Sequence, residues 1–465
     1  EMGGTRKGNR GEIAADGEVL AEYLDPFPLD PSAMTRLRFG TYDGGLAVAY
    51  LRVYQERVPE MLTATAVGDR LFERGQLAAA RQEYEHIARD HAGKSIAGEA
   101  LFKAGLCRLL EGDYAAARVA FEGVARTPAV ELYRNLAVLN TGAVLRLQGR
   151  YEDAFRHLTD LERRSADPDE RYRLAGELQA LSHAAWTHGQ AETAFRHLRF
   201  IIDHFPGTEM AERSEMVLAA NDPDEATRRR KLDRFLTRHP RPSKNQNNAF
   251  QLLAGSCLLL GDPAGALAAF DRHIAAYRGI NTRFVLGGLL GKGLVMAAMG
   301  RWADAGTIRN DMLALLPGDP LPARQARELD VFIARRQGEP DRAVRILETA
   351  AADGVIHPAE ELTLALLYRE RGEAARAEAL WRQVAAGPSS EESKAAALFL
   401  GDRSPDAFRT DESILFPYRC LYLWQYHRLR GEPDGAITLE YARQSAPFTP
   451  EVCEAIMALR PPGGR

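Results

Sequence analysis

Residues 287–293 are the part of the sequence that comes nearest to a phosphate-binding loop. Such a loop needs glycines at fixed spacing and a Ser or Thr after its lysine, because backbone N–H groups and a hydroxyl hold the phosphates and their metal. Here the spacing differs, and Lys292 is followed by Gly293. The stretch also lies within an apolar helical pattern. We therefore predict that these glycines allow close helix packing and bind no phosphate.

The histidines and cysteines are not spaced for a metal site or a redox pair. His183 and His188 are five residues apart, as are His86 and His91, so each pair would lie about 140° apart around a helix. No Cys-x-x-Cys, His-Glu-x-x-His or Gly-x-Ser-x-Gly motif occurs. We predict no catalytic residue, no metal and no cofactor. The four cysteines are expected to be buried apolar side chains: Cys107, Cys257, Cys420 and Cys453.

The charge balance disfavours nucleic acid as a partner. The 465 residues carry a formal net charge of −4, whereas nucleic-acid-binding surfaces are usually basic. Residues 228–231, Arg-Arg-Arg-Lys, follow several acidic residues and are interpreted as a solvated helix face with ion pairs. A basic patch that binds an acidic or phosphorylated tail is the alternative.

The apolar stretch 284–300 contains Lys292 and is shorter than the roughly 20 residues of a membrane span. We expect a soluble segment, either cytoplasmic or extracytoplasmic. The chain begins at Glu1 with no signal-like segment, and we interpret it as a piece of a longer protein.

Elements that would position a site follow two patterns. Over residues 11–58 apolar residues alternate, as at Val19, Ala21 and Tyr23 after Asp16-Gly17, and the alternation returns near residues 37–41 and 46–54. Period-two alternation with Asp-Gly turns is typical of β-hairpins. We therefore assign 1–58 to a partial antiparallel β segment and 59–460 to helices.

The helical part repeats a glycine followed five residues later by alanine. The glycine is expected to end a helix in a left-handed conformation, and the alanine to let the next helix pack closely. Asn221 and Ala226 fit the same slot, and successive units start 32 to 40 residues apart until a final gap of 59. The turn positions are Gly75, Gly112, Gly149, Gly189, Gly261, Gly300, Gly338, Gly372 and Gly431.

This period, with first-helix glycines at Gly68, Gly105, Gly142 and Gly293, resembles the tetratricopeptide repeat family. The usual early tryptophan is absent, and most unit lengths are above 34 residues. The resemblance implies an all-α solenoid of about ten to eleven helical pairs, here preceded by the β segment. Some similar repeats hold a peptide carboxylate with Lys and Asn on first helices. Lys103 and Asn140 occupy such positions, but Ala66 and Ala180 replace the remaining residues, so we predict no carboxylate capture.

A solenoid exposes a groove lined by first helices, which suits a peptide or a partner's helix. Gln179, His183 and Trp186 fall on one first-helix stripe, with Asn248 and Gln251 in a later unit. These five residues are the candidate groove, although Trp186 has packing against the next unit as its alternative. The first functional hypothesis is therefore a non-catalytic protein-binding scaffold.

Two other functions remain open from the sequence. The segments "ADGEVLAEYLDPFPL", "RLRFGTYDGG" and "VAYLRVY" resemble the closing strands of a concanavalin A-like lectin or glucanase sandwich. A sandwich followed by repeats is similar to the C-terminal region of bacterial receptor-like serine/threonine kinases, whose kinase activity would lie outside this chain. The second hypothesis is such an accessory region, and the third is carbohydrate or cell-envelope binding.

Overall fold

The computed structural model describes residues 2–7, 10–15, 18–24 and 63–459, apart from 128, 130, 166, 412, 415, 432–438, 440–442 and 444–447. The chain divides into two compact units, Glu1–Met210 and Ala211–Arg465. Within the described ranges, none of the helices combines the length and hydropathy that a membrane crossing needs. The same residues contain no group of three or more His, Cys, Asp or Glu side chains that could hold a metal ion.

The first unit begins with a three-stranded antiparallel sheet in the order β1-β2-β3. Its strands are β1 (Met2–Lys7), β2 (Arg10–Ala15) and β3 (Glu18–Leu24). The alternating residues Val19, Ala21 and Tyr23 lie on β3, which pairs with β2 in antiparallel orientation. The other two predicted stretches, near 37–41 and 46–54, lie outside the described residues, so the assignment of 1–58 to a sandwich stays a prediction.

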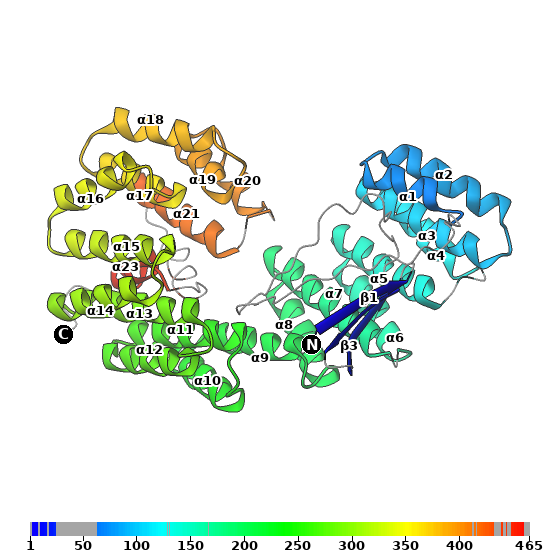
Figure 1. Ribbon diagram of the computed structural model, residues 1–465, viewed down its shortest axis with the longest axis horizontal. Helices are drawn as coiled ribbons and strands as arrows, with labels where there is room; N and C mark the ends of the chain where they lie inside the picture. Colours follow the sequence, from blue (N-terminus) through cyan, green and yellow to red (C-terminus); the bar gives the residue numbers. More distant parts are fainter. Residues whose placement is uncertain are drawn as a thin grey trace. The chain divides into compact units, whose positions relative to one another are not determined.

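Helices of the first unit follow one another as antiparallel pairs (Figure 1). Their bounds are α1 (Ala66–Glu73), α2 (Leu77–Asp90), α3 (Ser95–Leu110), α4 (Tyr114–Val124), α5 (Glu131–Leu147), α6 (Tyr151–Glu162), α7 (Pro168–Thr187) and α8 (Ala191–His204).

The second unit continues with paired helices and ends with two that return toward earlier ones. The helices are α9 (Glu209–Ala220, which starts at the boundary), α10 (Glu225–Arg238), α11 (Lys244–Leu259), α12 (Pro263–Tyr277), α13 (Thr282–Ala298), α14 (Trp302–Leu315), α15 (Pro320–Arg336), α16 (Pro340–Ala352), α17 (Pro358–Glu370), α18 (Ala374–Ala385), α19 (Glu391–Leu400), α20 (Pro405–Arg409), α21 (Phe416–Leu429) and α23 (Pro450–Ala458).

The predicted turn glycines all have positive φ, from 70° at Gly431 to 83° at Gly372. A side chain is disfavoured in this region, so glycine lets the chain leave one helix and start the next within a few residues. The alanine five residues later is almost completely buried in eight units: Ala80, Ala117, Ala154, Ala194, Ala266, Ala305, Ala343 and Ala377.

First-helix glycines allow the two helices of a pair to approach closely. A Cβ on Gly68 would lie 2.5 Å from the ring of Tyr84, and one on Gly105 would lie 2.6 Å from Phe121. A Cβ on Gly142 would lie 2.5 Å from the side chain of Leu158. In each pair the large side chain is the residue four positions after the buried alanine. The large residue of the second helix therefore fills the space that glycine leaves on the first.

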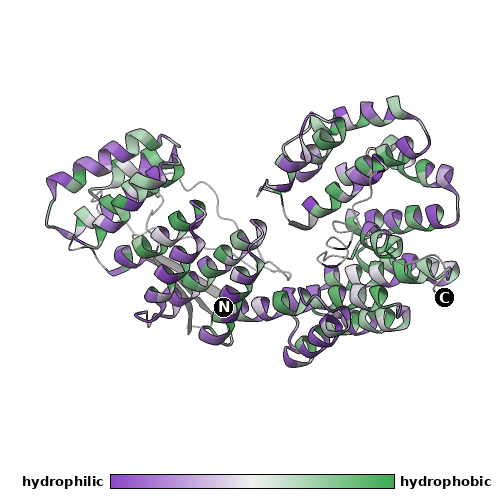
Figure 2. Ribbon diagram, turned by 180° about the vertical axis from the view of Figure 1, so that it is seen from behind, coloured by the Kyte–Doolittle hydropathy of each residue, from purple (hydrophilic) through white to green (hydrophobic). Residues whose placement is uncertain are grey.

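Packing also explains the glycine-rich stretch and the cysteines. Residues 287–293 lie inside α13, and a Cβ on Gly291 would lie 2.3 Å from Phe270. This close approach agrees with the prediction that these glycines serve packing. All four cysteines are buried, as predicted. Figure 2 shows how the apolar residues gather where neighbouring helices of a unit face one another.

The pair α9–α10 departs from the repeat rule. Ala226 is only half-buried, whereas Arg228 is fully buried. Arg228, Leu232 and Phe235 are all buried and have the spacing that Ala80, Tyr84 and Ile87 show in the first pair. An arginine therefore occupies the alanine slot, two residues later than predicted. The interpretation of residues 228–231 as a solvated face was wrong for Arg228.

We expect Ala266→Leu to lower the free energy of unfolding by about 1–3 kcal/mol, because a larger side chain overpacks a closed slot. Ala226→Leu is the matched control, since it makes the same change where the alanine is half-buried. We expect it to change stability by less than about 0.5 kcal/mol. Urea unfolding of the full chain, followed by far-UV circular dichroism, measures both. Equal losses of unfolding free energy in the two variants would contradict the conclusion that Arg228, and not Ala226, occupies the closely packed position in α10.

Candidate peptide-binding surface

The most informative surface of the second unit is covered by the chain's own end. Residues 448–458, here called the C-terminal segment, comprise Phe448, Thr449 and helix α23. Helix α23 contacts α11, α13 and α15 together, whereas a repeat helix mainly contacts its neighbours in sequence. These three are first helices of successive pairs, and we call their shared face the first-helix surface. The segment therefore lies across the array as a bound helix would.

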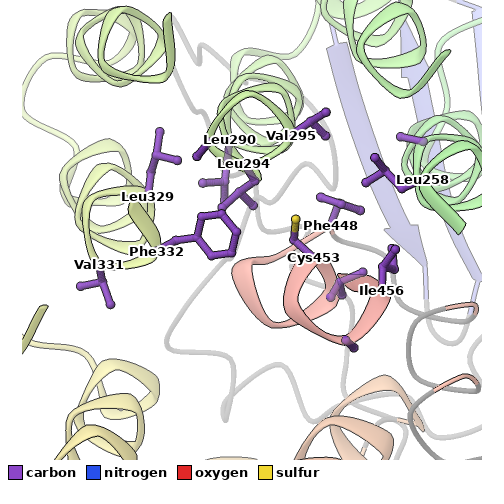
Figure 3. Close-up of a cluster of buried hydrophobic side chains, with 14 of the residues drawn as sticks. Leu258, Leu290, Leu294, Val295, Leu329, Val331, Phe332, Phe448, Cys453 and Ile456 are labelled. Atoms are coloured by element: carbon purple, nitrogen blue, oxygen red, sulfur yellow. The ribbon is translucent and has the colours of Figure 1, made fainter. Parts of the chain in front are cut away.

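Apolar contacts supply the centre of this interface. Phe448, Val452, Cys453, Ala455 and Ile456 are all at most 1% exposed. Figure 3 shows Phe448, Cys453 and Ile456 near Leu258 of α11, Leu290 and Leu294 of α13, and Phe332 of α15. The rings of Phe448 and Phe270 meet edge to face, with centroids 5.4 Å apart. One face of α23 therefore joins the core of the second unit.

An amide side chain captures the backbone of the segment. The N–H of Phe448 donates to Oε1 of Gln251, at 2.5 Å, and Gln251 is 3% exposed. Nε2 of Gln251 donates to Oδ1 of Asn247, which lies 2.8 Å from Nε2 of His273. Since an amide oxygen only accepts, Nε2 of His273 is the donor there. This arrangement leaves Oε1 of Gln251 directed at a main-chain N–H.

Burial keeps His273 neutral. It lowers the pKa of the imidazole to about 4, so that only one of its ring nitrogens carries a proton near neutral pH. A protonated ring would have to place a second N–H in the apolar surroundings of Gly288 and Ile274. The amide network is therefore stable in one orientation at neutral pH.

Arg228 anchors the chain just before the segment. Its Nε donates to the carbonyl of Ala220 at 2.7 Å, and its Nη1 donates to Glu225 at 2.7 Å. Its Nη2 donates to the carbonyl of Arg443. The guanidinium of Arg443 in turn pairs with Glu225, at 3.0 Å, and donates to the carbonyl of Asp222. The arginine in the alanine slot thus links α10 to the end of the chain.

Four charges join α23 to α15, α17 and α21. Glu454 pairs with Arg335 of α15 and, at 3.0 Å, with Arg428 of α21. Both arginines also pair with Glu370 of α17, at 3.2 Å for Arg335. The four side chains form a closed ring of alternating charge. Because they are only partly exposed, their attraction is screened less than that of a surface pair.

The carboxylate of Glu451 on α23 opposes this attraction, because it lies near the buried carboxyl of Glu328 on α15. Burial raises the pKa of Glu328 on α15 to about 8, with a further contribution from the nearby carboxylate of Glu451. Arg324 and Arg327 oppose the shift, while Glu360 adds to it. Burial also raises the pKa of Glu451. Docking of α23 therefore brings acidic groups together where ionisation is disfavoured.

The predicted groove residues of the first unit make contacts within that unit. Gln179 donates to the carbonyl of Met210 at 3.3 Å. Trp186 is half-buried, with its ring centroid 5.2 Å from that of Phe195, and His183 is exposed. The ring contact matches the packing alternative for Trp186. Whether this stripe binds a partner stays a prediction.

The predicted residues of the second unit lie on α11. Gln251 contacts the C-terminal segment directly, while Asn248 is half-buried and accepts from Nδ2 of Asn247 at 3.1 Å. Sequence reasoning missed Asn247, His273, Phe448 and Arg228. A helix-start signal, Thr-Pro-Glu at 449–451, was present before an apolar run, but nothing in the sequence states where that helix docks.

Lys103 and Asn140 are both engaged inside the first unit. Lys103 is fully buried, and its Nζ lies 2.9 Å from both Asp69 and Glu99 and 3.1 Å from Thr65. Asn140 donates to the carbonyl of Leu136 on its own helix. The absence of carboxylate capture stays a prediction.

Residues 99–127 match the family model of the tetratricopeptide repeat. They span most of α3, the turn at Gly112 and all of α4. The chain is a tetratricopeptide-like α-solenoid. A search of curated proteins finds no match to the sequence.

Three similar solved structures have low sequence identity and low TM-scores against this chain. A tetratricopeptide repeat protein from Parabacteroides merdae is 15% identical, with 64% of this chain and 96% of that one covered and a TM-score of 0.34. Yeast Tom70 is 11% identical, with 85% and 94% covered and a TM-score of 0.34. The quorum sensor NprR from B. thuringiensis is 11% identical, with 69% and 96% covered and a TM-score of 0.36. Neither the lectin resemblance nor the kinase-region hypothesis finds support in these comparisons.

We expect Glu328→Gln to stabilise the chain at pH 8 and to have little effect near pH 4.5. A carboxyl whose pKa is raised in the folded state contributes stability at low pH, and that stability is lost as pH rises from its unfolded value to about 8. The neutral amide avoids the loss, with a gain of about 1–2 kcal/mol after allowance for partial exposure. Urea unfolding at both pH values measures the difference.

Glu348→Gln is the matched control for this prediction. Hydrogen bonds from Arg376 and Tyr368 lower the pKa of Glu348, so its carboxylate is favoured in the folded chain. Its replacement should give no gain at pH 8. A pH-independent effect of Glu328→Gln would show that Glu328 is not held against ionisation.

Proposed function

We propose that this chain is a non-catalytic scaffold that binds a helical segment of a partner protein on the first-helix surface of its second unit. One observation carries the proposal, namely that the C-terminal segment of the chain itself lies there, with its backbone held by Gln251. The surface thereby combines an apolar centre with a polar group for the main chain. Recognition of a peptide needs both, because burial supplies affinity and a hydrogen bond sets the register.

The polar features around this surface favour binding over catalysis. Nδ2 of Asn247 donates to Asn248, and its Oδ1 accepts from Gln251 and His273, so these groups hold one another in place. The carboxylates of Glu370 and Glu454 are paired with arginines. Groups that are fully engaged in this way orient a ligand, whereas a general acid or base must be able to exchange a proton with one.

The proposal can be tested with a chain whose own segment is disabled. Phe448→Ala combined with Ile456→Asp removes the anchoring ring and places a charge on the apolar face of α23. We expect this full-length variant to bind a fluorescent peptide of residues 446–460, with Ser in place of Cys453, in a fluorescence-anisotropy titration. A peptide that carries the same two changes should not bind.

Gln251→Ala in the disabled chain tests the hydrogen bond to the peptide backbone. We expect its dissociation constant to rise about fivefold, since a hydrogen bond of this kind contributes about 1 kcal/mol. Gln383→Ala is the matched control, because Gln383 lies on α18 and donates to Glu361 at an exposed position. If a correctly folded disabled chain, checked by circular dichroism, fails to bind the peptide, the proposed function is wrong.

A further inference from the structure

We propose that the C-terminal segment is a reversible occupant of the chain's own binding surface, and that the partner is an amphipathic helix which takes its place. This inference rests on the proposed function and adds two statements to it. The first is that the segment detaches while the solenoid remains folded. The second is that the contacts of the segment define the chemistry of the partner.

The start of the segment and the position of its contacts are both compatible with a separable ligand. Its helix has a cap of its own, with Oγ1 of Thr449 accepting from the N–H of Val452 at 3.4 Å and Pro450 in the first turn. Such a helix start depends on local residues and does not need the preceding repeat. The segment also contacts helices that lie more than a hundred residues earlier in the sequence. It can therefore leave without opening the contact between any two successive hairpins.

Opposing electrostatic effects keep the docked state from being strongly favoured. The ring of Glu454, Arg335, Arg428 and Glu370 attracts α23. Glu451 on the same helix lies near Glu328, whose other charged neighbours are Glu360, Arg324 and Arg327, the two arginines in partial compensation. Burial of five apolar side chains favours docking. The loss of conformational freedom of all the residues in the segment 448–458 opposes it. Docking is therefore a balance that a competing helix can shift.

The contacts of the segment specify what a competing helix must offer. Phe448 supplies an aromatic ring for Phe270 and a main-chain N–H for Gln251. Apolar side chains follow at the positions of Val452, Cys453, Ala455 and Ile456, which form one helical face. A carboxylate at the position of Glu454 reaches Arg335 and Arg428. The partner segment is thus an aromatic residue followed by a capped, acidic amphipathic helix.

The chain contains its own reporter for detachment. Cys453 is fully buried on the docked face of α23, whereas Cys257 is buried in α11 and Cys107 in α3 of the other unit. A thiol reacts with N-ethylmaleimide only when it is exposed. If α23 detaches alone, Cys453 becomes accessible while Cys257 and Cys107 stay protected.

The experiment is alkylation of the wild-type full chain with N-ethylmaleimide under native conditions, with the rate at each cysteine measured by mass spectrometry. We expect Cys453 to react at least about tenfold faster than Cys257, because local opening requires less free energy than unfolding of the unit. The peptide of residues 446–460 with Ser at position 453 should raise the Cys453 rate further. The same peptide with Gln in place of Glu454 should have a smaller effect.

A variant of the chain tests the charged ring. Glu454→Gln removes one member, and we expect the Cys453 rate to rise about fivefold, as for loss of a partly exposed ion pair. Glu378→Gln is the matched control, since it removes only the exposed pair with Arg382 on α18. It should leave the Cys453 rate unchanged.

Three results would overturn the inference. Equal alkylation rates at Cys453 and Cys257 would show that α23 leaves only when the unit unfolds. Insensitivity of the Cys453 rate to the peptide would show that no helix replaces the segment. A dimer in light scattering, with Cys453 protected in proportion to protein concentration, would identify a second copy of this chain as the occupant. In each case peptide binding by the disabled chain would still test the proposed function separately.

Discussion

The structure depends on how closely two successive helices can approach each other. A Cβ on Gly68 or Gly105 would overlap an aromatic ring of the next helix, and the alanines at the start of second helices are almost completely buried. Small side chains at these positions bring large ones into contact on both sides. Because most pairs meet this condition, each unit is built by addition of pairs, and in the second unit the first helices α11, α13 and α15 share one face.

The exception to that rule has a structural consequence. Arg228 occupies the alanine slot of α10, and a buried guanidinium must have its donors satisfied. It meets this need with the carbonyl of Ala220, with Glu225 and with the carbonyl of Arg443. An arginine at this position would be unfavourable in an ordinary pair. Here its guanidinium binds the returning C-terminal residues through the carbonyl of Arg443. The repeat pattern is interrupted where the C-terminal residues return.

The surface that the segment covers combines three kinds of contact in separate places. Apolar side chains lie at the centre, the amide network of Gln251, Asn247 and His273 lies at the start of the segment, and the charged ring links α23 to α15, α17 and α21. The amide recognises any main chain with a free N–H, whereas the ring and the apolar face distinguish one helix from another. Affinity, register and specificity thus have different physical sources on this surface.

Local rules made much of the fold predictable from the sequence. A left-handed turn favours glycine, and close helix packing requires a small residue at a fixed offset, so Gly75 with Ala80 or Gly338 with Ala343 identifies a hairpin without any coordinates. The burial of the four cysteines followed from the same apolar periodicity. Gln251 was predicted as a groove residue because helical spacing alone places it on a first-helix face, and its role in binding a partner stays a proposal. The contacts between distant segments were decided only by the tertiary structure. Arg228 appeared to belong to a solvated charged run, and its burial depends on a carbonyl that lies 215 residues away in sequence. The sequence signals at 449–451 predict a helix start, but the position where α23 docks is set by the combined shape and charge of α11, α13, α15 and their neighbours, which no local pattern contains.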